Sequence, residues 1–260
     1  MFSGGAKDAL WRKSLKPLMK MSYGTSLTSN DSTPQEEPGC ERAALTPYGP
    51  ARFRYCKHPA GCVRGALAAY IAGISVANVL SGSTTTAVTT GLTANAYQYD
   101  VLIVLDVNAS AGASPEGYCA PVKSNSTTVI YLDPENPLPA ALAVNDDCYV
   151  YTFCKGEAAA AGDVRSDLLG VAMCAVTATY WGWFQFDGYC SYAKVEAATT
   201  ITAEKALIAG TAALSISSTS NPTLFAGCLV QAQAFTNDLV DDVMSGVKLW
   251  KLGEGHQISA

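Results

Sequence analysis

From residue 48 onward, short apolar segments alternate with clusters of Gly, Pro, Asn and Asp. Short segments separated by regular turn signals are typical of a β-sandwich or barrel, and not of strands that alternate with helices. The abundance of Thr, Val and Ala favours strands as well. We therefore predict a mainly β fold, a sandwich or barrel of many short antiparallel strands. The expected strands cover residues 51–56, 100–106, 129–132, 148–154, 168–176, 194–201, 212–216, 226–235 and 247–252.

Two of these strands have informative patterns. Residues 51–56 alternate small or apolar side chains with basic ones, which predicts a half-exposed strand. The run from Val101 to Leu105 is continuously apolar, which suits a strand buried on both faces. Helix is expected mainly near the N-terminus, with a second candidate around residues 235–244.

The segment from Gly170 to Gly188 concentrates large aromatic side chains. We predict two tightly joined strands closed by a turn at Asp187-Gly188. The aromatics either fill a core, or pack on the core with one face and on a neighbouring subunit with the other. A sugar-binding platform is a third interpretation, although few polar partners lie nearby. The packing or interface residues are Tyr180, Trp181, Trp183, Phe184, Phe186 and Gly188, with both tryptophans expected on one face.

Residues 1–48 differ from the rest of the chain. Within residues 7–20, apolar side chains fall at helical spacing between basic ones, which predicts a short amphipathic helix. Residues 28–39 are polar and include two prolines, so we expect a linker that cannot bury itself. We therefore divide the chain into an N-terminal arm and linker, 1–48, and a β-rich domain, 49–260. That domain divides near residue 156 if it has two parts. The alternative is that residues 1–48 fold back on the domain.

Charge suggests what the arm contacts. Residues 1–21 carry five basic side chains and one aspartate, a local net charge of +4, whereas the whole chain has a net charge of −5. A basic helix is either a solvated face or a segment whose apolar stripe enters a groove on an acidic partner while its cations steer the approach. On the second interpretation, the contact residues are Leu10, Trp11, Lys13, Leu15 and Lys16.

Composition favours a subunit of an assembly. Charged residues make up 15% of the chain, whereas soluble domains have roughly 25%, and hydrophobic residues reach 49%. A surface of small neutral residues repels its neighbours weakly. The acidic balance provides no basic field for nucleic acid. The most apolar stretch, 65–80, is shorter than the roughly 20 residues that a bilayer requires, so we expect no membrane span.

Side chains able to catalyse reactions are scarce. A nucleophile–histidine pair would need His58 or His256, and no phosphate-binding, dinucleotide-binding or zinc-protease motif is present. We expect neither an enzyme nor a cofactor. The best metal candidate is Cys56, His58 and Cys62, with Cys40 upstream. Zinc accepts such ligands, but this spacing matches no common paired motif and also suits a turn with free thiols. Nine scattered cysteines without a signal peptide predict reduced thiols and assembly in the cytoplasm.

Two segments resemble a group of tailed-bacteriophage virion proteins that includes capsid decoration proteins. Residues 170–188 are similar to their pattern of Gly-x-Ala, a Val-Thr pair and an aromatic-Gly-Trp-x-Gln-x-x-Gly segment. Residues 49–57, followed by Gly65-Ala-Leu, are similar to their opening strand. The chain departs from the pattern at Cys56 and at the Cys/His turn that follows.

The resemblance implies a β-rich component on the exterior of a virion head, a homotrimer at local three-fold sites whose partner is the major capsid protein. On this interpretation the chain is a capsid decoration, or cement, protein that stabilises the shell and is assembled in the host cytoplasm. The alternative is a head-fibre or adhesin subunit that binds host glycans. A second alternative is a major or minor capsid shell protein. Nucleic acid and membrane are not expected as partners.

Overall fold

Strands account for almost all regular structure in the computed structural model. It describes residues 26–46, 49–76, 79–90, 97–107, 113–195, 206–216, 224–229, 243–249 and 251–253. These ranges contain no α-helix, and Arg165–Asp167 forms a complete 3₁₀ turn. No helix in them is long and apolar enough to cross a membrane. The prediction of a mainly β chain with many short antiparallel strands is therefore confirmed.

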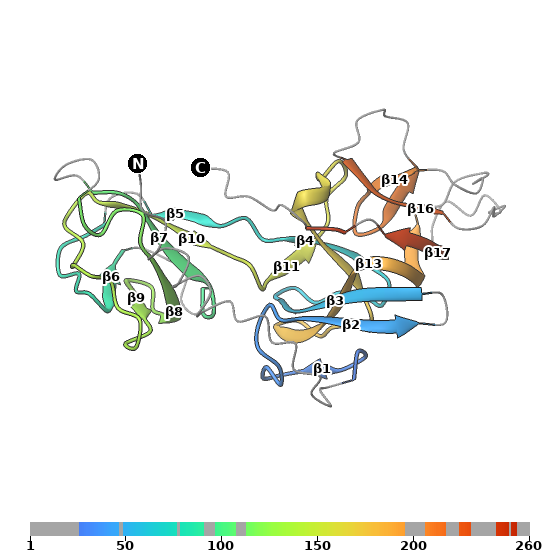
Figure 1. Cartoon of the computed structure of the whole chain (residues 1–260), viewed down its shortest axis with the longest axis horizontal. Coiled ribbons are helices and arrows are strands. Elements are labelled where there is room, and N and C mark those ends of the chain that lie inside the picture. Colours follow the sequence, from blue (N-terminus) through green and yellow to red (C-terminus); the bar gives the residue numbers. More distant parts are fainter. Residues whose placement is uncertain are drawn as a thin grey trace.

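The strands form two curled sheets that lie side by side as two lobes (Figure 1). The large lobe contains an 11-stranded sheet and the small lobe a six-stranded sheet. The large sheet is built from β1 (Asn30–Asp31), β2 (Glu41–Thr46), β3 (Gly49–His58), β4 (Leu67–Tyr70), β11 (Gly156–Ala158), β12 (Leu168–Ala172), β13 (Tyr180–Val195), β14 (Ala206–Ala209), β15 (Leu214–Ile216), β16 (Phe225–Leu229) and β17 (Val243–Leu249). The small sheet is built from β5 (Ile74–Val76), β6 (Ala87–Thr89), β7 (Val101–Asp106), β8 (Cys119–Asn125), β9 (Val129–Leu132) and β10 (Asp147–Tyr151).

The small lobe is an insertion between two neighbouring strands of the large sheet. The chain leaves the large lobe after β4 and returns at β11, and these two strands pair antiparallel, with Gly156 opposite Tyr70. The pairing continues into the connectors, where the Ile71 amide donates to the Lys155 carbonyl at 3.2 Å. The expected division near residue 156 thus falls where the insertion ends, but the two lobes are not successive halves of the chain.

Strand β13 is the spine of the large sheet. Its first half pairs with β3, from Tyr180 opposite His58 to Asp187 opposite Arg52. Its second half pairs with β17, beginning with Gly188 opposite Leu249. The predicted turn at Asp187-Gly188 is therefore wrong, because the strand passes straight through these residues.

Glycine at position 188 serves a different purpose from a turn. Its φ is +86°, and a Cβ at this position would lie 2.4 Å from the Pro50 carbonyl oxygen. Pairing is irregular on both sides of it, with shifts between Gln185 and Asp187 and between Cys190 and Ala193. The tight connection lies earlier, at residues 173–179, which join β12 to β13 as an antiparallel pair.

Two further strands differ from expectation. β3 is largely buried on both faces, and its Arg54 is 8% exposed, because β2 and β13 flank the strand and aromatic rings receive the guanidinium. β7 alternates instead: Leu102 and Val104 are buried, whereas Leu105 is exposed. One face of this apolar strand therefore packs on the core of the small lobe, and its other face carries apolar side chains toward the outside.

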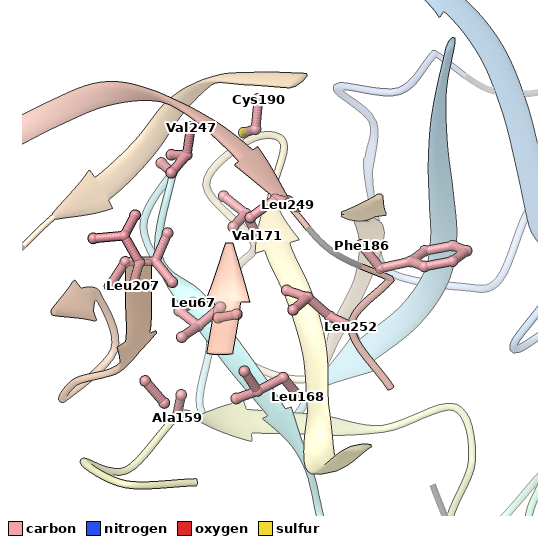
Figure 2. Packing of buried hydrophobic residues seen from close by; sticks show 14 of the residues in the cluster. Leu67, Ala159, Leu168, Val171, Phe186, Cys190, Leu207, Val247, Leu249 and Leu252 are labelled. Atoms are coloured by element: carbon pink, nitrogen blue, oxygen red, sulfur yellow. The ribbon is translucent and has the colours of Figure 1, made fainter. Parts of the chain in front are cut away.

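Each lobe is stabilised by its own apolar packing: the large lobe has two cores and the small lobe has one. In the large lobe, one core gathers around β12, the second half of β13 and the C-terminal strands (Figure 2), with Leu67, Val171, Leu207, Val247 and Leu249 among its members and Phe186 at its margin. The other lies between β3 and the first half of β13. The small lobe has its own core, which includes Leu102, Val122, Ile130, Leu132 and Val150.

The described part of the predicted linker belongs to the large lobe. Asn30 and Asp31 pair with Gly182 and Trp181 of β13, and β2 pairs with β3 along its full length. The predicted N-terminal helix lies outside the described residues. So does most of the helix expected at 235–244, although Val243 and Met244 begin β17.

Candidate functional site: the aromatic segment and the lobe junction

The aromatic segment, residues 180–186 of β13, is organised around Tyr55 of β3. The Tyr55 ring stacks on Trp181, with centroids 5.7 Å apart and an interplanar angle of 18°. It also meets Trp183 at 5.1 Å. Because Trp181 and Trp183 are two residues apart on one strand, their side chains lie on the same face of the sheet as Tyr55. The prediction that the tryptophans share a face is in accord with this geometry.

Two arginine side chains cover Phe186, at the end of the segment. The Arg54 and Arg52 guanidinium groups lie 4.3 and 4.9 Å from the Phe186 ring centroid. Arg54 also donates to Glu41 at 2.6 Å and to the hydroxyl of Tyr70. Planar guanidinium groups stack on rings while their N–H groups bind carboxylates, so these arginines join β2 to the spine.

Within the chain, the segment is core. Trp181, Trp183, Phe184 and Phe186 are at most 2% exposed, and Tyr180 is half-buried. The four buried rings therefore offer almost no surface to another subunit. Trp183 has no exposed area that could accept a sugar ring, so the sugar-binding interpretation of this residue is wrong.

Residues 26–46 anchor the beginning of the described chain to the spine. The Tyr55 hydroxyl donates to the Asp31 carboxylate at 2.6 Å. Asn30 and Thr177 exchange two hydrogen bonds, of 2.9 and 3.0 Å. The predicted arm contacts Leu10, Trp11, Lys13, Leu15 and Lys16 lie outside the described residues. What the structure gives is the place from which residues 1–25 depart.

An ion pair bridges the two lobes. Asp100 immediately precedes β7 of the small lobe, and Lys155 immediately precedes β11 of the large lobe. The Lys155 ammonium lies 2.6 Å from an Asp100 carboxylate oxygen, and the two side chains are 5% and 0% exposed. Beside the pair, the Tyr99 ring meets the edge of Trp181 at 5.6 Å. We call the cluster of Tyr99, Asp100, Cys154, Lys155 and Trp181 the lobe junction.

Burial dominates the electrostatics of the junction. Desolvation raises the pKa of Asp100 to about 7, although the Lys155 ammonium acts in the opposite direction. Burial also raises the pKa of the Cys154 thiol well above its ordinary value, and this thiol lies 3.9 Å from an Asp100 oxygen. For a buried ion pair, the desolvation cost can exceed the attraction between the two charges.

The predicted metal candidate does not assemble. Within the described ranges, no group of three or more His, Cys, Asp or Glu side chains could hold a metal ion. His58 is 1% exposed, and its ring stacks against Phe184 at 6.3 Å. Neither of its ring nitrogens has a hydrogen-bond partner among the described residues. Burial lowers the pKa of His58, so the buried ring is neutral.

All nine cysteines are free thiols. Burial raises the pKa of Cys40 and Cys62 to about 11, and that of Cys148 to about 12. The thiolate is the nucleophilic form, so these side chains are protonated and unreactive at neutral pH.

Exposed apolar side chains gather on the small lobe. Eight large hydrophobic residues are exposed in the part of the chain that is described, and six of them lie between β5 and β10. Leu105 and Tyr118 flank a main-chain bond from the Val104 amide to the Tyr118 carbonyl. The others in this lobe are Leu80, Tyr99, Tyr131 and Val144. Contiguous exposed apolar patches are typical of interaction surfaces, and strand pairing places Leu105 and Tyr118 close together on this lobe.

A shallow depression lies beside the connectors. Its volume is about 250 Å³, and both lobes contribute to its walls. Three tyrosines and three carboxylates line it: Tyr70, Tyr149, Tyr151, Glu157, Asp163 and Asp167. Local sequence patterns do not indicate this depression or the Asp100–Lys155 pair, because both combine residues far apart in the chain.

Comparison of the chain with protein-family models, with curated proteins and with solved structures finds no match.

Proposed function

We propose that the protein is a capsid decoration protein, a β-rich subunit that binds the exterior of a bacteriophage head and stabilises the shell. Its partners are the major capsid protein and two further copies of itself. The observation that carries the proposal is the concentration of exposed apolar side chains on one inserted lobe, on a chain with little charge. The resemblance of residues 170–188 and 49–57 to virion proteins gives the partner class.

The two lobes contribute different features that support this function. The large lobe encloses its aromatic rings and holds residues 26–46 against the spine. The large lobe thereby provides a fixed attachment point for the basic arm. The small lobe offers Leu105, Tyr118 and Tyr131 to a partner. Two separate contacts on one subunit, multiplied in a trimer, raise the effective concentration at the shell without requiring any strong single contact.

The test is occupancy on capsids that have been stripped of this protein, measured by co-sedimentation at fixed salt. We expect removal of residues 1–25 to lower occupancy while the circular dichroism spectrum persists, because the described fold begins at Ser26. Leu105→Ser/Tyr118→Ser should lower it as well. Val63→Ser, at a 57% exposed position of the large lobe, is the matched control. Unchanged occupancy for both altered proteins refutes the assignment, and light scattering should give the mass of a trimer.

The depression at the connectors favours a second candidate, the glycan-binding head-fibre subunit. Aromatic walls with carboxylates can stack on a sugar ring and accept bonds from its hydroxyls. This candidate predicts that a glycan array gives signals that Glu157→Gln abolishes and that Glu135→Gln, at an exposed loop position, leaves intact. No signal with either protein rejects it. The shell-protein alternative predicts that the purified chain assembles into closed shells alone.

A further inference from the structure

We infer that the Asp100–Lys155 pair is an orientation lock, which sets how the small lobe sits on the large lobe and contributes little to the net stability of either. The inference concerns the internal architecture of the chain and does not depend on the proposed function.

Backbone pairing leaves the orientation of the lobes to side chains. Among the described strands, none of the small sheet pairs with a strand of the large sheet. The lobes are joined by two connectors, 71–73 and 152–155, which run from β4 to β5 and from β10 to β11. Ile71, Cys154 and Lys155 extend the backbone pairing of the large lobe, so bending between the lobes falls to residues 72–73 and 152–153. Side chains at the lobe junction must therefore select one arrangement.

The pair has the geometry for this task. Lys155 lies in the return connector, where its backbone forms a parallel bridge with Lys57 of β3. Its position therefore belongs to the large lobe. Asp100 belongs to the small lobe, because its carbonyl accepts from the Val122 amide of β8. A bond of 2.6 Å between two fully enclosed charges tolerates little displacement, since any opening leaves a charge buried without its partner.

The same pair is a poor source of net stability. Burial raises the pKa of Asp100 despite the neighbouring Lys155 ammonium, so desolvation weighs against the charged form of the carboxyl. Buried ion pairs of this type can often be replaced by apolar side chains of similar volume without loss of stability, whereas removal of one partner alone is costly. Orientation and stability can therefore be separated by experiment.

The experiment compares the double variant Asp100→Leu/Lys155→Met with the unaltered protein. We expect a similar melting temperature, because both charges are removed together. Hydrogen exchange in residues 71–73 and 152–155 should accelerate on the order of tenfold, and small-angle scattering should show a broader distribution of distances. Arg52→Met, which removes an exposed ion pair within the large lobe and leaves the Arg54–Glu41 contact in place, is the control and should change neither.

Each outcome decides the matter. Unchanged exchange and scattering in the double variant refute the lock, because the lobes then keep their arrangement without the pair. Failure of the double variant to fold also refutes it, because the pair is then required for stability. The single variant Asp100→Asn should be less stable than the double variant, since it leaves the buried Lys155 ammonium without a carboxylate to pair with. The reverse order contradicts the inference.

Discussion

The Tyr55 hydroxyl lies 2.6 Å from the Asp31 carboxylate and connects the N-terminal segment to the middle of the large sheet. The same oxygen accepts a hydrogen bond from the Gln35 amide at 3.2 Å. One phenol therefore holds two points of a polar segment that has almost no apolar side chains of its own. Burial raises the pKa of Tyr55, and the bond to Asp31 raises it further, so the hydroxyl remains a donor at neutral pH.

Tyr55→Phe should loosen this segment, which β1 still pairs with β13, while the sheet persists. The lost bond to a carboxylate is worth about 1.5 kcal/mol of unfolding free energy, the lower end for charged partners, because the contact is only part-buried. Hydrogen exchange should rise in residues 29–36. Tyr131→Phe, at a 45% exposed position, is the control and should have no effect. Equal stability of both variants would contradict the anchoring role.

Trp183→Ala should destabilise the large lobe severely. The side chain is completely buried between Tyr55 and the Arg42 guanidinium, which lies 4.4 Å from its ring. Removal of a buried aromatic costs about 3–5 kcal/mol, measurable by urea unfolding. Leu45→Ala, at an 86% exposed position on β2, should stay within about 0.5 kcal/mol. A small loss for Trp183→Ala would mean that this ring packs less tightly than its burial indicates.

The contribution of His58 to stability should become less favourable as the pH decreases below the ordinary imidazole pKa of 6.5. Burial lowers the pKa of His58 in the folded protein, so the unfolded chain takes up a proton that the folded chain does not. His58→Phe keeps a flat ring against Phe184 and should flatten the dependence of unfolding free energy on pH. His256 is present in both proteins. An unchanged slope would show that folded His58 titrates normally.

Gly188→Ala should be more destabilising than Gly162→Ala. Both glycines have similar positive φ values, +86° and +89°, so both substitutions carry a backbone cost of about 1–2 kcal/mol. Only at position 188 does the new methyl group meet the Pro50 carbonyl oxygen, because the space around Gly162 is open. Thermal melts of the two variants measure the difference. Equal melting temperatures would show that β3 moves aside without cost.

Local signals predicted individual strands well. Residues 129–132 were expected as a strand and form β9 with the same bounds, because turn residues flank an alternating apolar segment. Asp187-Gly188 misled the prediction because the same dipeptide serves two purposes. Its glycine normally permits a turn, whereas here it permits positive φ and a close approach to β3 inside a continuous strand.

The arrangement of the strands could not be predicted from local pattern. The spine pairs with β3, more than a hundred residues earlier in the chain, and such pairing depends on which surfaces fit together. Asp100 and Lys155 were missed for the same reason: each is a single charged residue beside a strand, and only the fold brings them together. Tyr55 carried no signal of its central position, because Arg52 and Arg54 gave the strand a half-exposed pattern.

The place where the small lobe joins the large one has an evolutionary consequence. Because Ile71 and Lys155 are hydrogen-bonded neighbours, the polypeptide departs and re-enters at a single point. A lineage can lengthen, exchange or lose everything between them without re-pairing any strand of the remaining framework. Sequence change that alters what the molecule touches is thereby free to accumulate in one replaceable unit, while the aromatic interior that holds the scaffold together stays as it is.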